Sequence, residues 1–261
     1  MQRVLLAAGM LAFASSSGFT ADLPAKARPM APIAAPIYNW SGFYIGGNAG
    51  GGWGRADYLN TANTTLFGDV AGPPPFSHNT SGFIGGGQIG FNWQVTNWVF
   101  GLEAMYDYSD IRGSVNPLRG GAPPLGMDDV FETRIRSLFL GTARLGYAWN
   151  NWLLYAKGGY AGGDVRVSVV DTVGANQGAG SDTKWRHGWT VGGGLEYGIT
   201  PNWTVAAEYN YVRLQSGSYE LGGTAAPAVY TFDVDTRDTH LATIRLNYKF
   251  DWGGGPVVAR Y

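Results

Sequence analysis

The chain has no cysteine, few charged residues and no apolar stretch long enough for a membrane-spanning helix. The missing cysteine excludes a disulfide framework, a thiol nucleophile and a cysteine-based metal site. A transmembrane helix needs roughly 18 consecutive apolar residues, which no segment of the chain reaches. The formal net charge of −1 argues against a nucleic-acid-binding surface. What the chain has instead is glycine, 41 of 261 residues, and long stretches in which apolar side chains alternate with small or polar ones.

The first residues have the pattern of an export signal. A basic residue is followed by an apolar run over residues 4–14 and then by small residues, which predicts a secretory signal peptide over residues 1–20. Cleavage is expected after Thr20, with Ala21 as the alternative. Residues 21–38 are rich in proline and alanine and lack periodicity, which indicates a semi-extended periplasmic tether. We therefore expect an exported chain whose folded part follows the tether.

An Asn-Trp dipeptide recurs along the chain, at residues 39–40, 97–98, 151–152 and 202–203. An alternating stretch runs from each copy, and a second one precedes each of the last three copies across a very short turn. Alternating strands joined by short turns form antiparallel hairpins. The pattern predicts an all-β fold, an eight-stranded antiparallel up-and-down transmembrane barrel over residues 39–250 with a tail over residues 251–261. The expected strands cover residues 41–54, 80–94, 98–109, 132–149, 152–169, 185–199, 203–216 and 237–250.

The connections at the two ends of this barrel differ in length. One end has turns of a few residues, while the other end has long segments rich in glycine, proline and polar residues. Transmembrane barrels show this difference, with short turns in the periplasm and long loops outside the cell. The long loops are expected over residues 55–79, 111–131, 170–184 and 217–236.

A polar or charged residue lies five positions from the aromatic or proline residue at the turn end of seven strands. Because neighbouring side chains on a strand point to opposite faces, this odd separation puts the polar residue on the face away from the aromatic ring. Three members of the set are acidic and three are basic, so they can neutralise one another, as buried charges require. The predicted charge layer of the lumen consists of Gln88, Glu103, Arg144, Lys157, Glu196, Glu208 and Arg245.

Aromatic residues gather at two heights on the opposite, apolar face. With a rise of about 3.3 Å per residue and a tilt of about 40°, the two heights are roughly 20–25 Å apart, close to the apolar band of an outer-membrane barrel. Tryptophan and tyrosine prefer the two membrane interfaces. We predict a turn-side belt of Trp93, Trp98, Trp149, Trp152, Trp203 and Phe250, and a loop-side belt of Tyr108, Phe139, Tyr160, Trp189 and Tyr211.

The same alternation fits two kinds of barrel. An apolar face turned inward gives a soluble, lipocalin-like barrel with an apolar ligand cavity. An apolar face turned outward meets lipid and seals the charge layer in a lumen only wide enough for side chains. The two aromatic belts favour the second kind. Charges on the apolar side beyond the loop-side belt, at Asp110, Asp164, Arg166 and Arg213, indicate that the strands stand clear of lipid there.

Motifs that carry chemistry in other proteins have plainer interpretations here. Residues 85–90 match GxGxxG but continue into a strand, so we expect small residues in a crowded lumen rather than a phosphate site. The histidines, His78, His187 and His240, lack metal-ligand spacing, and we expect them to be solvated surface residues. A haem or metal contact at the outer rim is the alternative.

No enzyme activity, no cofactor and no metal site are expected. The acidic pair at residues 128–129 and the pair Asp238 and His240 are similar to the acidic and histidine pairs of outer-membrane proteases, but nothing fixes a water between them. Ser77 and His78 are adjacent, and adjacent side chains on a strand point apart, so they do not form a hydrolase pair.

Two segments resemble a known family. Residues 38–48 (YNWSGFYIGGN) and residues 245–250 (RLNYKF) with the tail that follows resemble the start and the end of the alphaproteobacterial outer-membrane β-barrel proteins, the porin-like surface antigens of rhizobial and related bacteria. The resemblance implies an eight-stranded barrel of the OmpA/OmpX type in the cell outer membrane. It also implies outer-membrane lipid and lipopolysaccharide as surroundings, and assembly machinery that reads a C-terminal aromatic residue. Eleven residues follow Phe250, so either Phe250 or Tyr261 can be that residue.

The function we expect is structural. The protein contributes to envelope integrity and to contact with a host or the environment through its outer loops, and ion pairs plug its lumen. One alternative is a narrow, low-conductance porin for small solutes, and another is a surface receptor, with haem as the leading ligand. No nucleic-acid partner is expected.

Overall fold

The computed structural model describes residues 38–60, 75–116, 130–171, 178–222 and 229–250. These residues contain nine strands: β1 (Gly42–Asn60), β2 (Phe76–Val95), β3 (Trp98–Val115), β4 (Val130–Trp149), β5 (Trp152–Asp171), β6 (Gly178–Gly198), β7 (Trp203–Leu214), β8 (Gly217–Gly222) and β9 (Val229–Lys249). No helix in this part of the chain is long and apolar enough to cross a membrane. The predicted signal peptide, the tether up to residue 37 and the tail over residues 251–261 lie outside the described residues.

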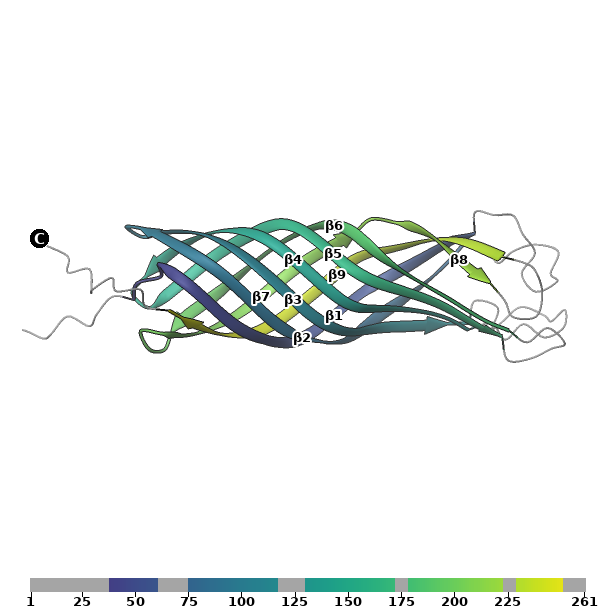
Figure 1. Ribbon diagram of the computed structural model, residues 1–261, viewed down its shortest axis with the longest axis horizontal. Coiled ribbons are helices and arrows are strands. Elements are labelled where there is room, and N and C mark those ends of the chain that lie inside the picture. The colour runs from purple at the N-terminus through teal and green to yellow at the C-terminus, as the bar shows by residue number, and fades with distance from the viewer. Residues whose placement is uncertain (1–37, 61–74, 117–129, 172–177, 223–228, 251–261) are drawn as a thin grey trace, which may run out of the picture. The chain divides into compact units, whose positions relative to one another are not determined.

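Eight of the strands close into a ring in which all neighbours are antiparallel. The order is β1-β2-β3-β4-β5-β6-β7-β9, and β9 pairs back onto β1. Figure 1 shows these strands running obliquely around the barrel. The remaining strand, β8, pairs with β9 beyond the end of β7 and so continues the seventh strand after a break at Gln215 and Ser216. The predicted eight-stranded up-and-down barrel is confirmed.

The strands reach further toward the loop end than the sequence analysis predicted. β2 begins at Phe76, β6 at Gly178 and β9 at Val229, each well inside a stretch that was expected to be loop. The outward-facing residues of these extensions include Ser77, Asn79, Ser181, Asp233 and Asp235, a composition that is typical of loops. Inward-facing Phe232 and Val234 of β9 are buried and apolar, whereas β6 has Asp182, Lys184 and Arg186 at the positions that alternate with its exposed residues. Strands occupy both ends of each expected loop, so the prediction of loop was wrong for the first and last residues of the ranges 55–79, 111–131, 170–184 and 217–236.

The repeated asparagine fastens each hairpin to the next strand along the ring. The side-chain Nδ2 of Asn97 donates to the Ala148 carbonyl over 2.8 Å, and the Ala148 amide donates to the Asn97 carbonyl over 2.7 Å. Asn151 makes the same two bonds with Gly198, and Asn202 makes them with Lys249. The asparagine thus acts as one more rung of the ladder at the turn end, which gives the repeat a structural cause.

The barrel has two sections with opposite character. In the turn-side section, between the short turns and the loop-side belt, the outward residues are aromatic or aliphatic and the inward residues are polar or charged. In the loop-side section, beyond that belt, most outward residues are polar, with Leu59, Val130 and Val170 as exceptions, and most inward residues form a buried apolar cluster. Members of the cluster include Tyr58, Phe131, Leu138, Val165, Leu214 and Phe232.

Irregularities in the ladder lie where the two sections meet. β4 has one more residue than β5 between Ile135 and Ser137, and a similar shift occurs where β9 passes Trp53 on β1. In β9 the shift includes Asp238, whose φ is +55°. A bulge of one residue moves the following side chains to the other face. Strict alternation from the exterior belt residue Phe139 predicts that Ile135, four positions earlier, points outward. That prediction is wrong, because the bulge leaves Ile135 buried inside the barrel.

Candidate functional site

The seven residues of the predicted charge layer come from seven different strands of the ring and lie inside the barrel. None of them is more than 5% exposed. The alternation of each strand points the side chain inward, and the register of neighbouring strands brings them to similar depths, as the direct pairing of Arg144 with Lys157 illustrates. The residues are Gln88 on β2, Glu103 on β3, Arg144 on β4, Lys157 on β5, Glu196 on β6, Glu208 on β7 and Arg245 on β9.

Glu103 is surrounded by all three basic residues. Its carboxylate lies 3.0 Å from Lys157 Nζ and 3.6 Å from Arg144 Nη1, and it also pairs with Arg245. The hydroxyl of Tyr44 donates to the same carboxylate over 2.6 Å. A carboxylate with this many donors is fully compensated, which is the condition under which a buried charge is tolerated.

Glu208 is a second acceptor for two of these cations. Lys157 Nζ lies 2.6 Å from its carboxylate, and Arg245 pairs with it as well. The hydroxyl of Tyr155 donates to it over 2.6 Å, and Asn210 Nδ2 donates over 2.8 Å. Lys157 and Arg245 therefore both bridge Glu103 and Glu208 across the lumen.

Glu196 and Gln88 extend the network. Arg144 Nη2 lies 2.8 Å from Glu196, whose other oxygen accepts from Asn247 Nδ2 over 2.9 Å. Gln88 Nε2 donates to Asn247 Oδ1 over 2.7 Å, and Gln88 Oε1 accepts from Asn48 Nδ2 over 3.1 Å. We call the seven layer residues together with Tyr44, Tyr155 and Asn247, which links Gln88 to Glu196, the charge network. It is continuous from one wall of the barrel to the other.

Alternation with Phe43 and Leu154 predicts that Tyr44 and Tyr155 lie on the polar face of their strands, but no spacing in the sequence predicts that they join the charge network. Glycines explain how two such large side chains fit. A Cβ on Gly90 would collide with the Tyr44 hydroxyl and ring, and a Cβ on Gly194 would collide with those of Tyr155. Within the glycine-rich run over residues 85–90, Gly86 and Gly90 thus supply space in the lumen, as predicted, while Gly85 and Gly87 lie on the opposite face of the strand. Such close approach is one of the uses of glycine inside strands.

A small apolar cluster, which we call the floor, lies inside the barrel at its turn end. Trp40 is only 2% exposed, its ring centroid lies 4.5 Å from that of Tyr38, and its backbone N–H donates a hydrogen bond to Gln94 Oε1 over 2.8 Å. Val99 and Leu153 complete the cluster. Trp40 belongs to the first Asn-Trp copy, yet the tryptophans of the other copies are on the exterior. No feature of the dipeptide distinguishes this copy from the others, so the burial of Trp40 could not be predicted from it.

The residues of the two predicted aromatic belts lie on the exterior. Near the turns, Trp149 is paired directly with Trp152, and Trp98 contacts Tyr147 edge-on at 5.4 Å. At the other height, Tyr160 pairs with Trp189, whose ring lies 5.4 Å from that of Tyr211. Other aromatic residues on the exterior were not predicted as members of either belt: Trp53, Tyr147, Tyr197, Tyr209 and Tyr248.

The three histidines have two different environments. His78 is buried in the loop-side section, 5.6 Å from the ring of Tyr58, and this burial lowers the pKa of its imidazole. The expectation of a solvated His78 was therefore wrong, because the strand extends past the predicted loop and turns this side chain inward. His187 and His240 are on the exterior, where Nδ1 of each lies 2.6 Å from a tyrosine hydroxyl, those of Tyr160 and Tyr209.

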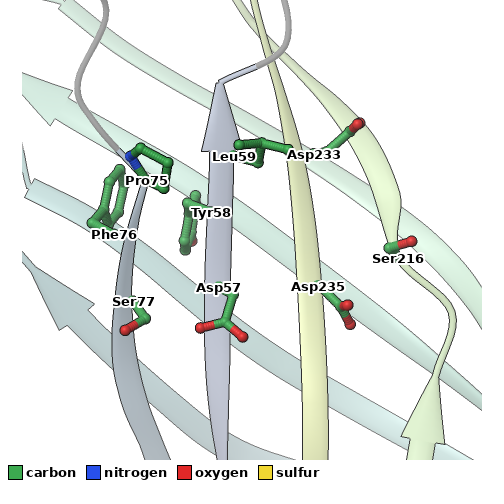
Figure 2. Close-up of a pocket in the computed structure, with 9 residues that line it drawn as sticks. All are labelled: Asp57, Tyr58, Leu59, Pro75, Phe76, Ser77, Ser216, Asp233 and Asp235. Atoms are coloured by element: carbon green, nitrogen blue, oxygen red, sulfur yellow. The ribbon is translucent and has the colours of Figure 1, made fainter.

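Figure 2 shows a cavity of about 440 Å³ at the loop end, between β1, β2 and β9. Asp57, Asp233 and Asp235 line it with Ser77 and Ser216. Asp57 lies 3.1 Å from Arg55 on its own strand, and Asp233 accepts a hydrogen bond from Ser218. In the part of the chain that the structure describes, no group of three or more histidine and acidic residues could hold a metal ion. Residues 128–129 lie outside that part.

Comparison with known proteins gives a consistent picture. Residues 11–250 match the model of the outer membrane protein beta-barrel domain. The 31 kDa outer-membrane immunogenic protein of Brucella melitensis is 32% identical over 262 aligned positions, covering 96% of this chain and all of the relative. The 25 kDa outer-membrane immunogenic protein of Brucella abortus is 30% identical, covering 95% of this chain and 97% of the relative. The 22 kDa outer membrane protein of Rhizobium leguminosarum is 32% identical, covering 73% of this chain and 72% of the relative.

Among solved structures, the outer membrane protease OmpT of Escherichia coli superimposes with a TM-score of 0.51. The match covers 83% of this chain and 99% of the protease, at 12% sequence identity. A likeness at this identity concerns the fold alone, a barrel of antiparallel strands.

Proposed function

This chain belongs to the outer membrane protein beta-barrel family, and from that premise we propose that it is a non-enzymatic structural protein of the cell surface whose lumen is closed. The protein is located in the outer membrane, and its relatives are outer-membrane immunogenic proteins. The single observation that carries the proposal is the charge network, in which Glu103 and Glu208 are bridged twice across the lumen.

The proposed closure is supported at three depths. The floor of Tyr38 and Trp40 occupies the turn end, the charge network occupies the middle, and the apolar cluster occupies the loop-side section. A barrel of eight strands has an interior just wide enough for side chains to fill. A water file through it needs a continuous polar path, and an apolar constriction opposes such a path. The low-conductance porin is therefore the less favoured alternative.

We infer further that the two aromatic belts lie at the two membrane interfaces. From Trp98 to Tyr108 the strand rises by about 33 Å, which a tilt of about 40° reduces to roughly 25 Å, the height of the apolar band of outer-membrane barrels. Beyond Tyr108 the outward residues on the same strand are Asp110 and Arg112. In this orientation the loop-side section stands outside the membrane, where it presents a charged exterior to the environment.

Planar-bilayer recording of the refolded protein tests the closure. We expect no steady single channels from the wild type. Glu103→Gln and Arg144→Gln alter the network, while Leu102→Ala changes an exterior residue of the same strand and serves as the control. Steady wild-type channels whose conductance changes with either network variant, but not with Leu102→Ala, would overturn the proposal and establish the porin.

The surface receptor remains a separate hypothesis with its own test. Two of the three histidines, His187 and His240, are on the exterior near tyrosine hydroxyls and aromatic rings. A haem titration of the wild type and of the double variant His187→Gln/His240→Gln measures whether they bind. Absorbance changes of equal size in both proteins would remove these histidines as ligands.

A further inference from the structure

Three arginines form a row across the exterior of the loop-side section. Arg112 on β3 is paired directly with Arg134 on β4, which is paired directly with Arg166 on β5. All three point outward, because the residues that alternate with them belong to the buried cluster. Like charges directly opposite each other on neighbouring strands destabilise a sheet. A row of this kind lowers the stability of the fold. We therefore infer that the three arginines serve a purpose other than stabilising the barrel.

The carboxylates nearby neutralise the row only in part. Arg134 Nη2 lies 2.8 Å from Asp110 Oδ1, but Arg112 Nη2 is 4.0 Å from the other oxygen of the same aspartate. Arg166 Nη2 donates to the hydroxyl of Ser181 over 3.1 Å. With Arg136, this face carries four arginines, and its outward acidic residues on β3, β4 and β5 are Asp110, Glu132 and Asp164, which leaves a net charge of 4 − 3 = +1.

The row lies at a defined height on the barrel. Arg134 Nη2 donates to the hydroxyl of Tyr108 over 3.1 Å, so the guanidinium groups stand directly above the loop-side belt. This is the height at which the exterior changes from apolar to charged. On β1, two strands away from β3, Arg55 lies two residues beyond the exterior Trp53 and forms an ion pair with Asp57 at 3.1 Å. The positions that flank the row are uncharged, Ser81 on β2 opposite Arg112 and Thr183 on β6 opposite Arg166, so the three-arginine row is confined to β3, β4 and β5.

We propose that Arg112, Arg134 and Arg166 bind phosphate groups of the lipopolysaccharide headgroup in the outer leaflet. Guanidinium groups present paired N–H donors that match phosphate oxygens, and a phosphate between neighbouring arginines relieves their repulsion. Tyr108 and Tyr160 beneath the row face the acyl side of the same headgroup. The assignment rests on the proposed orientation, in which the loop-side belt lies at the outer interface.

The experiment measures binding of bisphosphorylated lipid A by the refolded full chain in neutral detergent. We expect the triple variant Arg112→Gln/Arg134→Gln/Arg166→Gln to lose affinity by about tenfold, since each exposed charge contact contributes modestly. Arg55→Gln is the matched control, because Arg55 and Arg112 have equally exposed side chains, 60% each. It should bind like the wild type. Heat-dependent gel mobility shows that each variant is folded.

A second variant is expected to raise the affinity for lipid A, which a poorly folded protein would not do. Asp110→Asn removes the carboxylate that competes for Arg134 and Arg112, so affinity for lipid A should rise by about threefold. Lipid A stripped of phosphate should bind the wild type and the triple variant equally weakly. Inorganic phosphate at the same phosphate concentration should compete poorly.

Three results would overturn the proposal: equal lipid A affinity in the wild type and the triple variant, an unchanged or lower affinity in Asp110→Asn, or full competition by inorganic phosphate, which would make the row a general anion site.

Conductance is recorded on the same preparations, to separate this proposal from that of a closed lumen. A conducting barrel that still loses lipid A affinity in the triple variant would refute the closed lumen and keep this site. A barrel that does not conduct and whose lipid A affinity is unchanged in the triple variant would keep the closed lumen and refute this site.

Discussion

The turn-side and loop-side sections are built from the same strands, yet one is inverted relative to the other. Along β3, Leu102 points outward and Glu103 inward in the turn-side section, while in the loop-side section Ile111 points inward and Arg112 outward. The period-two alternation is the same in both. What differs is which face carries the apolar residues, and this follows the medium outside the barrel. Apolar side chains face outward where that medium is lipid and inward where it is water.

The largest expected effect comes from removing one charge in the turn-side section. Glu103→Gln leaves Lys157, Arg144 and Arg245 without their shared acceptor, and breaking a buried pair costs about 3–5 kcal/mol in the free energy of unfolding. The same change at Glu132, on the exterior of the loop-side section, should cost less than about 0.5 kcal/mol. Denaturant unfolding in lipid vesicles measures both. Equal losses would mean that the network is solvated and the two sections are alike.

The second comparison inserts a charge on the exterior. Leu102 is 69% exposed in the middle of the apolar band, and Leu102→Arg should destabilise the barrel by about 2–4 kcal/mol because the guanidinium meets hydrocarbon. Ser114→Arg places the same side chain on the exterior of the loop-side section of the same strand, where the expected change is within about 0.5 kcal/mol. The comparison is made by measuring the free energy of unfolding of both variants in lipid vesicles. If Leu102→Arg were harmless, lipid would not cover that face.

The smallest effect concerns pH and the loop-side core. Burial lowers the pKa of His78, so below about pH 6.5 the unfolded chain binds a proton that the folded chain resists. The unfolding free energy should therefore fall as the pH drops from about 7 to about 5. His78→Leu should weaken this dependence, whereas His187→Gln, on the exterior, should leave it in place. An unfolding series at several pH values measures the slopes, and identical slopes in the wild type and His78→Leu would contradict a buried neutral imidazole.

Much of the fold could be predicted because the alternation is strong in the turn-side section. There, lipid outside and paired charges inside both demand strict period two, so single positions such as Glu103 and Lys157 could be placed inward from spacing alone. The ring of eight strands followed from counting hairpins. The asparagine of the repeat was recognised as a marker, but its bond to the next hairpin depends on strand register, which a single sequence does not contain.

The loop-side section was harder to predict for two physical reasons. Its outward residues have the composition of loops, so the strand ends at Phe76 and Gly178 were missed. The bulge beside Arg136 then moves the alternation by one residue, which reversed the expected direction of Ile135. Bulges carry no local signal of their own in this sequence. The burial of His78 and of Trp40 could not be predicted either, because it depends on contacts with strands that are distant in sequence.

The most direct test of the account is a nitroxide scan along β3 in lipid vesicles, which the absence of native cysteine makes possible with single-cysteine variants. The outward positions at Phe100, Leu102 and Tyr106 should be relaxed by oxygen dissolved in lipid, those at Arg112 and Ser114 by a water-soluble agent, and the inward positions at Val99, Met105 and Ile111 by neither. The change from lipid to water should occur between Tyr108 and Arg112. Access of the water-soluble agent to Val99 and Met105, or of lipid oxygen to Arg112, would contradict a closed barrel that inverts at the membrane surface.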